Sequence, residues 1–444
     1  MQFIAGGGGN EIGASFYLTL WDDGTVIATD CGGRPSSGFN PDIFVVGTVP
    51  TSKEFQPQEP DFSVVSNVDI LLLTHGHLDH VLMVPVLARM HPRMQIYATA
   101  PTKAFCAFHW FETIKLAQHK NILSSFTQEE AEQALERIQI IEPTLDTSIR
   151  IRLTDRLAFC AVSAGHILGA VSYILYENNQ PVGFYSGDIA NHSQRTVLGA
   201  PKLTFDGLRF MVVESTRLTE QNEPRETIDE RFITAIREAA SRGMSIRILG
   251  FAIGRSNETY ELVREAVGTT VPIYLEGAAK RISEIYLKYS PDGCIDPDIR
   301  THFVADQSQR RAILAAYEPN IVIIPSAMQF GGLGMTYAEH GVSRTDHLFI
   351  SPGWLDPCSP EYAFFETKGR VLSVRKRTIP ILCKKERFSL TAHCDGNDIM
   401  EMHARMKPEK TILIHGDNTR MDQFLLQNPG KGFVKGENKT LISM

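Results

Sequence analysis

The sequence predicts an α/β protein built from two lobes, and three observations lead to this prediction. The chain has 444 residues, which is more than one ordinary hydrophobic core holds. Between about residues 209 and 325, apolar strands alternate with helical segments, which is the pattern of a parallel sheet covered by helices on both faces. An earlier apolar strand ends abruptly in a group of histidines, which indicates a site at the edge of another sheet.

The first lobe is predicted to start with a hairpin and to continue with further strands and helices. The hairpin joins 15–21 to 25–29 through a turn at Asp22, Asp23 and Gly24. Residues 36–66 are rich in Pro, Ser and Gly and are predicted to form a surface excursion. Strands are also predicted at 68–74, 95–99, 149–153, 157–162, 171–176 and 182–185, and helices at 81–90, at 101–121 and from 127 onwards.

A second lobe is predicted to interrupt the first. Its strands are expected at 210–214, 245–249, 271–275 and 320–325, and its helices at 227–241, 257–267 and 278–287. After about residue 385 the pattern changes, and two histidine-bearing segments follow, around His393 and His415. We therefore predict a first part over 1–208, an inserted lobe over 209–385 and a return to the first lobe over 386–444.

The composition is that of a globular protein in a reducing compartment. Apolar residues make up 43% and charged residues 21% of the chain. The seven cysteines are scattered and odd in number, which favours free thiols in a cytoplasmic protein. No apolar run approaches the length of a membrane helix, so we expect no contact with a membrane. The net charge of −7 does not indicate a nucleic-acid partner, but a local basic groove would suffice for one.

The histidine group has the composition of a metal site. The strand before it leads into His75, His77, Asp79 and His80. In an extended segment every second residue shares a face, so the first three of these side chains can converge, and Gly76 allows a tight turn between them. Imidazoles combined with carboxylates suit zinc or a similar metal. The alternative, a polar loop with chance histidines, gives no packing reason for so dense a cluster.

Three later residues extend this set. His166, Asp188 and His415 each follow a buried strand, the first two after a glycine, and strand ends can bring such side chains to one edge of a sheet. Seven candidate ligands are too many for one tetrahedral zinc but suit two metal ions that share a carboxylate. Taken singly, a histidine here is more often an ordinary buried residue and the aspartate a turn residue. The seven candidates are His75, His77, Asp79, His80, His166, Asp188 and His415.

Residues 75–80 resemble the HxHxDH signature of the metallo-β-lactamase superfamily. Asp30, His166 and Asp188 match its other motifs, and the segments around Glu214, His393 and His415 look like motifs A, B and C of its β-CASP nucleases. Residues 251–258 are similar to a stretch of the same group. The resemblance implies an αβ/βα four-layer sandwich with an inserted β-CASP α/β lobe.

The resemblance also implies a role for each residue. His75, His77 and His166 would hold one zinc ion, while Asp79, His80 and His415 would hold a second, and Asp188 would bridge the two. Asp79 could also orient or deprotonate the attacking water. His393 would stabilise charge on the scissile phosphate or protonate the leaving oxygen, and Glu214 would orient its ring. Asp30 would support the metal loop. Without the motif order, Glu214 would be taken for a surface or capping acid and His393 for a loop histidine.

The substrate is less well defined by the sequence than the metal site. A basic run over 368–387, with Lys384 and Lys385 near its end, could follow a phosphate backbone, and a solvated β-ribbon explains the run equally well. Arg255 and Ser326 are further candidate phosphate contacts, whereas residues 349–358 depart from the pattern of the group.

We therefore expect a metal-dependent hydrolase, a zinc-dependent phosphodiesterase that cleaves RNA as an endo- or 5′-exoribonuclease. The attacking group would be a hydroxide activated by the two zinc ions. Histidine rather than valine at motif C is the RNA-type pattern in this group. The alternatives are a nuclease for single-stranded DNA, a small-molecule metallo-hydrolase on the same fold and a non-catalytic RNA-binding scaffold. A homodimer is possible.

Overall fold

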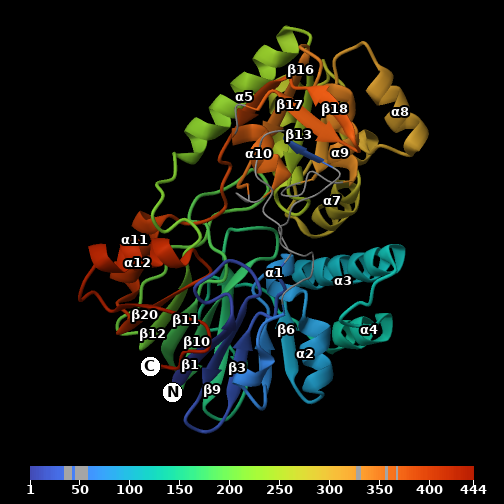
Figure 1. Ribbon diagram of the computed structural model, residues 1–444. Helices are drawn as coiled ribbons and strands as arrows, with labels where there is room; N and C mark the ends of the chain where they lie inside the picture. Colours follow the sequence, from blue (N-terminus) through green and yellow to red (C-terminus); the bar gives the residue numbers. More distant parts are fainter. Residues whose placement is uncertain (35–42, 46–58, 327–331, 356–358, 367–368) are drawn as a thin grey trace.

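The computed structural model describes residues 1–34, 43–45, 59–326, 332–355, 359–366 and 369–444. Within these ranges the chain forms a sandwich of two mixed sheets and a separate lobe on a parallel sheet (Figure 1). The fold class predicted from the sequence is confirmed. None of the helices in the described part of the chain is both long and apolar enough to span a membrane.

Two seven-stranded sheets make the sandwich. The first has the order β22 (Ile442–Ser443), β1 (Gln2–Gly7), β2 (Phe16–Leu20), β3 (Val26–Thr29), β5 (Ile70–Leu72), β6 (Gln95–Ala98) and β7 (Ile138–Ile140). The second has the order β21 (Phe433–Lys435), β20 (Lys410–Ile414), β12 (Phe210–Glu214), β11 (Gln180–Tyr185), β10 (Val171–Glu177), β9 (Leu157–Ser163) and β8 (Ile151–Arg152). Aromatic residues such as Phe3, Tyr97, Phe159 and Tyr173 pack in the layer between the sheets.

Helices cover the two outer faces of the sandwich and complete four layers. The first sheet is covered by α1 (Leu78–Val81), α2 (Val84–Met90), α3 (Ala100–Lys120) and α4 (Gln128–Arg137). The second sheet is covered by α11 (Gly396–Met406) and α12 (Asn418–Gln427). The apolar strands therefore bury both faces, which explains why they read as near-continuous hydrophobic runs.

The inserted lobe has a five-stranded parallel sheet with the order β14 (Ile273–Leu275), β15 (Ile321–Pro325), β13 (Ser245–Gly250), β16 (His347–Ser351) and β19 (Lys384–Arg387). Its helices are α5 (Arg225–Ser241), α6 (Arg255–Val267), α7 (Ala278–Tyr289), α8 (Gln307–Ala315), α9 (Gly332–Gly341) and α10 (Pro360–Glu366). The short strands β4 (Ile43–Val45), β17 (Val371–Val374) and β18 (Arg377–Pro380) pair beside it, and the 3-10 turns η1 (Phe62–Val64) and η2 (Ile299–His302) lie in loops.

The lobe boundaries differ from those predicted. The predicted start at residue 209 assigns β12 to the inserted lobe, but β12 pairs in parallel with β11 and β20 inside the sandwich. The predicted end at residue 385 falls inside β19, which pairs with β16 of the lobe. The inserted lobe therefore runs from after Glu214 to Arg387. Buried parallel strands of either sheet have the same apolar pattern, so the sequence could not assign β12.

Two other local features depart from the sequence expectations. Strand β1 was not predicted because it contains the first two of four consecutive glycines; glycine is needed there, since a Cβ on Gly7 would lie 2.2 Å from the Ala14 carbonyl oxygen. The single helix predicted over 81–90 is divided into α1 and α2. Most of the surface excursion predicted at 36–66 lies outside the described residues, namely at 36–42 and 46–58.

Candidate metal centre

The histidine loop follows β5 and runs into α1, at the junction of the sandwich with the inserted lobe (Figure 1). Asp30, which follows β3, fixes this loop by hydrogen bonds. Its carboxylate accepts hydrogen bonds from the Thr74 backbone at 2.8 Å, from the Thr74 hydroxyl at 2.7 Å and from His80 Nδ1 at 2.7 Å. The last contact leaves His80 Nε2 as the nitrogen that faces the site. Asp30 has a positive φ of 59°, a rare backbone state for a non-glycine residue that is typical of functional sites.

The first group of candidate ligands consists of three imidazoles and one carboxylate. His77 Nδ1 lies 3.1 Å from His75 Nε2 and 3.1 Å from His166 Nε2. Asp188 Oδ2 lies 3.6 Å from the same atoms of His75 and His166. Ligand atoms about 2.0–2.1 Å from a tetrahedral zinc ion are about 3.3 Å apart. The spacing of these four atoms therefore fits one tetrahedral ion.

The second group lies on the other side of Asp188. His415 Nε2 is 3.2 Å from Asp79 Oδ2, and His80 Nε2 is 3.9 Å from the same oxygen. The second oxygen of Asp188, Oδ1, lies 3.5 Å from both His80 Nε2 and His415 Nδ1. His415 follows β20 with a positive φ of 50°, and its backbone N–H donates to the Gly8 carbonyl at 2.7 Å. The two oxygens of Asp188 thus face the two groups separately.

A third group contains the residues matched to motifs A and B. His393 Nδ1 donates to Glu214 Oε1 at 2.7 Å. The buried Glu214 carboxylate also accepts from the backbone of Ile189 at 3.0 Å and of Thr216 at 3.2 Å. The rings of His393 and His166 lie 4.7 Å apart between centroids. His393 is therefore held beside the first group of ligands with its Nδ1 engaged and its Nε2 available.

Burial and neighbouring charges separate the protonation states of these histidines. Burial lowers the pKa of His75 and His166 well below the ordinary value, and it lowers the pKa of His77 to about 3. Burial also opposes charge on His80, but the carboxylates of Asp188, Asp30 and Asp79 outweigh it and raise the pKa of His80 to about 10. The three histidines of the first group are therefore neutral and ready to bind a cation, whereas the carboxylates around His80 favour its charged form, whose Nε2 proton a bound cation would displace.

The ligand groups fit a pair of metal ions on structural grounds alone. His80 Nε2 and Asp188 Oδ1 are buried and lack a hydrogen-bond partner within the described residues, although such atoms are normally satisfied. Both point into the second group of ligands, where a cation would satisfy them. The donor set of imidazole nitrogens and carboxylate oxygens suits zinc. All seven predicted ligands lie in the two groups, although the ligand roles stay predictions.

The predicted substrate contacts are placed less uniformly. Arg255 opens α6 as a buried side chain whose guanidinium donates to the Leu390 carbonyl at 2.6 Å and to the Gln194 side chain, so these nitrogens face protein acceptors and not the solvent. Ser326 follows β15, next to residues 327–331, which lie outside the described part. Lys385 donates to the Phe364 carbonyl at 2.6 Å. Lys384 is exposed on a groove of about 570 Å³ between α5 and β19.

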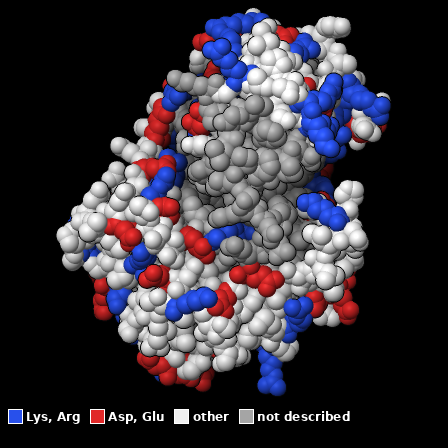
Figure 2. Space-filling model, in the orientation of Figure 1, with Lys and Arg blue, Asp and Glu red and all other residues white. Residues whose placement is uncertain are grey.

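The described part of the basic run forms the β17–β18 hairpin and β19, and three of its seven basic residues pair with acids. Arg375 and Arg377 both contact Glu339 of α9, at 3.0 and 2.8 Å, and Arg387 pairs with Glu366 of α10. Lys368 lies outside the described residues. Figure 2 shows Lys and Arg side chains gathered on the inserted lobe at its end away from the sandwich. This arrangement favours the solvated ribbon over a groove that leads to the metal centre.

We accordingly expect the double variant Arg375→Ala, Arg377→Ala to bind RNA with a Kd within about 2-fold of the parent chain, because both arginines already contact the Glu339 carboxylate. The variant should also fold normally, because loss of exposed ion pairs costs little stability. Fluorescence anisotropy with a labelled single-stranded RNA at fixed salt measures the Kd. A rise in Kd of about 10-fold or more, with a shallower salt dependence, would restore the hairpin as a phosphate contact.

Several residues at the site were not singled out from the sequence. Gln194, His192 and Asn222 each donate to backbone carbonyls around His166 or His393. Thr74 and Thr216 approach the Nδ1 atoms of His75 and His415, at 3.0 and 3.1 Å. Amides and hydroxyls in loops are common, and only the folded arrangement shows which of them face a ligand. For His192 and Gln194, the sequence offered one indication of a role at the site, which is their position just after Asp188.

Comparison with known proteins gives consistent results across the chain. Residues 35–241 match the beta-lactamase superfamily domain, and residues 378–427 match the Zn-dependent metallo-hydrolase RNA specificity domain. The chain is 25% identical to the RNase J-like protein of Methanocaldococcus jannaschii, over 95% of this chain and 93% of that protein. It is 24% identical to the endoribonuclease YSH1 of Kluyveromyces lactis over 96% of this chain, but it spans only 57% of that longer relative. A solved structure of a protein of unknown function from Enterococcus faecalis superposes with a TM-score of 0.58 at 14% identity, over 100% of this chain and 99% of that one, and supports the fold.

Proposed function

Because the chain belongs to the metallo-β-lactamase superfamily, in its β-CASP nuclease group, and is therefore a metal-dependent hydrolase, we propose that it is a ribonuclease working with two zinc ions. One observation carries this proposal: the two oxygens of Asp188 face two separate groups of ligands, each with atoms close enough to share one ion. A paired site of this kind suits displacement at phosphorus.

Seven residues would hold the two ions in this proposal. His75, His77 and His166 would hold one, and Asp79, His80 and His415 the other, with Asp188 shared. When bound, the ions supply Lewis acidity to a phosphoryl oxygen and lower the pKa of water. Asp30 keeps the proton of His80 on Nδ1, so that Nε2 stays a ligand. His166 is fixed in the same sense, because its Nδ1 donates to the Ala392 carbonyl at 2.7 Å.

His393 would act on the phosphodiester next to the metal ligands. Burial opposes a positive charge on its ring, but the Glu214 carboxylate outweighs burial and raises the pKa of His393. A protonated imidazole can stabilise charge on the phosphate and donate a proton to the leaving oxygen. Glu214 itself is fixed by two backbone N–H groups, so it holds the ring in one orientation. Asp79, in the second group of ligands, remains the candidate to orient the attacking water.

RNA is the substrate that the relatives favour. The RNA specificity match covers both His393 and His415, and the named relatives include an RNase J-like protein and an endoribonuclease. Free thiols at all six cysteines of the described chain support the further proposal of a cytoplasmic location. A homodimer and the use of single-stranded DNA stay predictions.

The test is cleavage of a 5′-monophosphorylated, end-labelled RNA and of the matched single-stranded DNA, with the zinc content of the same preparation measured by atomic emission. We expect about two zinc ions per chain, cleavage of RNA, at least about 10-fold slower cleavage of DNA, and loss of both activities after chelation. The product ladder separates endonucleolytic from 5′-exonucleolytic action. Equal or faster cleavage of DNA would reassign the substrate, and cleavage that survives complete metal removal would overturn the proposed chemistry.

A further inference from the structure

The segment Leu390–His393 lies between β19 and α11 and has no regular secondary structure. His393, at its end, lies beside the metal ligands. The four consecutive carbonyl groups of the segment each accept a hydrogen bond from a side chain of a different segment. The donors are Arg255 Nη1 to Leu390 at 2.6 Å, His192 Nε2 to Thr391 at 2.9 Å, His166 Nδ1 to Ala392 at 2.7 Å and Asn222 Nδ2 to His393 at 2.9 Å. These side chains take the place of the strand or helix that would otherwise fix the backbone.

Among these donors, Arg255 lies in the first turn of α6, a helix of the inserted lobe. It connects two parts of the centre, because its second terminal nitrogen donates to the side-chain oxygen of Gln194. The amide of Gln194 in turn donates to the carbonyls of Gly165 and His166, both at 2.8 Å. One guanidinium therefore contacts the His393 segment directly and the backbone of the metal ligand His166 through a single residue.

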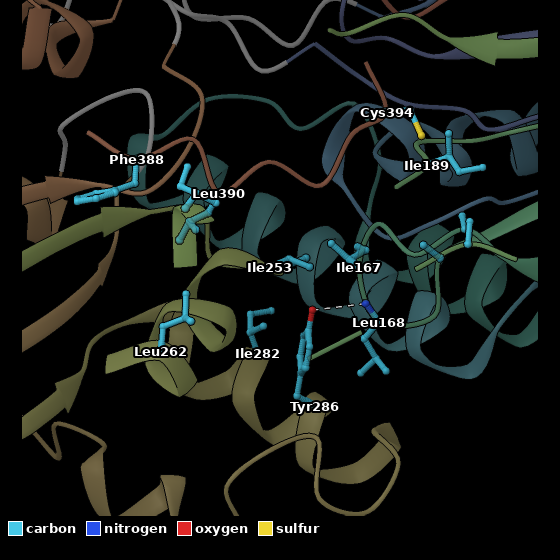
Figure 3. Packing of buried hydrophobic residues seen from close by; sticks show 14 of the residues in the cluster. Ile167, Leu168, Ile189, Ile253, Leu262, Ile282, Tyr286, Phe388, Leu390 and Cys394 are labelled. Carbon is cyan, nitrogen blue, oxygen red and sulfur yellow. Dashed lines mark hydrogen bonds between the residues drawn. The ribbon is translucent and has the colours of Figure 1, made fainter. Parts of the chain in front are cut away.

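The first turn of α6 is held firmly against the sandwich. One turn after Arg255, the fully buried Glu258 accepts from the backbone N–H groups of Arg195 at 2.9 Å and Thr196 at 3.1 Å, and it pairs with Arg225. Apolar side chains of both lobes pack together beside it, as Figure 3 shows for Ile167 and Leu168 of the sandwich and Ile253 and Tyr286 of the lobe. The hydrophobic core is continuous across this boundary.

We propose that Arg255, together with Gln194, is a positioning residue that fixes His166 and the His393 segment relative to each other, so that the placement of the inserted lobe sets the geometry of the reacting groups. The inference deepens the proposed function and rests on it for the activity measurement. Arg255 donates to the two acceptors from two nitrogens held in one planar fork, whereas an ammonium group has to reach both from a single nitrogen and is not pre-organised to do so. The side chain thereby acts through its neighbours and not as a contact to phosphate.

The test compares Arg255→Lys with Arg247→Lys. Arg247 is the matched control because it is a second buried arginine of the inserted lobe, and its Nη1 donates only to lobe carbonyls, those of Ile246 and Asn320 at 2.9 and 3.0 Å. We expect Arg255→Lys to retain its zinc and a KM within about 2-fold of the parent while kcat falls about 10–100-fold, the usual effect of removing a partner that orients a ligand. Arg247→Lys should leave kcat within about 2-fold even where it lowers Tm.

A second readout does not depend on activity. Hydrogen exchange of the metal-free protein, followed by mass spectrometry over 388–395, should be about 10-fold faster in Arg255→Lys and unchanged in Arg247→Lys, with β9 and β10 unaffected in both. Gln194→Leu provides a second variant in case Arg255→Lys folds poorly, and we expect it to lower kcat as well. Faster exchange in a chain that cleaves no RNA would uphold the positioning role and reject the proposed function.

Two results would overturn the proposal. If Arg255→Lys raised KM and left kcat unchanged, Arg255 would be a substrate contact, as the sequence first indicated. If Arg247→Lys lowered kcat and raised the exchange rate over 388–395 by the same factors as Arg255→Lys, in proportion to the loss of Tm in each, Arg255 would have only a structural role.

Discussion

Replacement of Asp188 by asparagine is expected to abolish RNA cleavage and to lower the zinc content to one ion per chain or less. The variant keeps the size and shape of the side chain but removes the negative charge that faces both ligand groups. The loss of kcat should exceed the roughly 10²–10³-fold that follows removal of a single transition-state donor, since two ions depend on the same carboxylate. Single-turnover cleavage of end-labelled RNA and atomic emission measure the two quantities.

Asp296→Asn is the matched control for this variant. Asp296 is a buried aspartate of the inserted lobe that accepts from Tyr260 at 2.5 Å and pairs with Arg264, away from the ligand groups. We expect it to lose stability but to retain zinc and cleavage. His75→Ala, which removes a ligand from one group only, should also abolish cleavage and reduce zinc. Undiminished cleavage by both Asp188→Asn and His75→Ala would contradict the two-metal assignment.

The ligand set could be proposed from the sequence because it depends on short-range features. His75, His77, Asp79 and His80 lie within six residues. The predicted extended geometry brings His75 and His77 together, but it is wrong for Asp79, which lies in α1 and joins the second group. His166, Asp188 and His415 each follow an apolar strand, and the ends of strands in one sheet lie near one another. Neither inference requires knowledge of which strands pair. The alternation of strands and helices was likewise enough to predict an α/β protein, whereas the four-layer sandwich was predicted from the family resemblance.

The rest of the site depends on contacts between distant residues, which a pattern does not encode. Arg375 and Arg377 pair with Glu339, which lies 36 and 38 residues earlier in the chain. The sequence therefore showed the two positive charges but not the carboxylate that pairs with them. Arg255 was predicted to contact phosphate by analogy with the β-CASP group, whereas in the fold its acceptors Leu390 and Gln194 come from two other segments. The donors to the His393 segment were missed for the same reason.

The variant His393→Ala is expected to keep both zinc ions and to lose about 10²–10⁴-fold in kcat, the range for a group that transfers a proton to or from the reacting atoms. The expectation follows from the geometry: Nδ1 is engaged by Glu214 at 2.7 Å, and His393 belongs to neither of the two main ligand groups. Metal content and cleavage are therefore separable at this residue, unlike at Asp188.

Glu214→Gln tests the same assignment from the other side of the hydrogen bond. A glutamine can still accept from the backbone of Ile189 or Thr216, but it removes the carboxylate that outweighs burial and raises the pKa of His393. Cleavage should fall about 10–100-fold, less than in His393→Ala, and the double variant should be no worse than His393→Ala alone, because Glu214 acts through the imidazole. Loss of zinc from His393→Ala would instead make this histidine a ligand, and additive losses in the double variant would give Glu214 a role independent of His393.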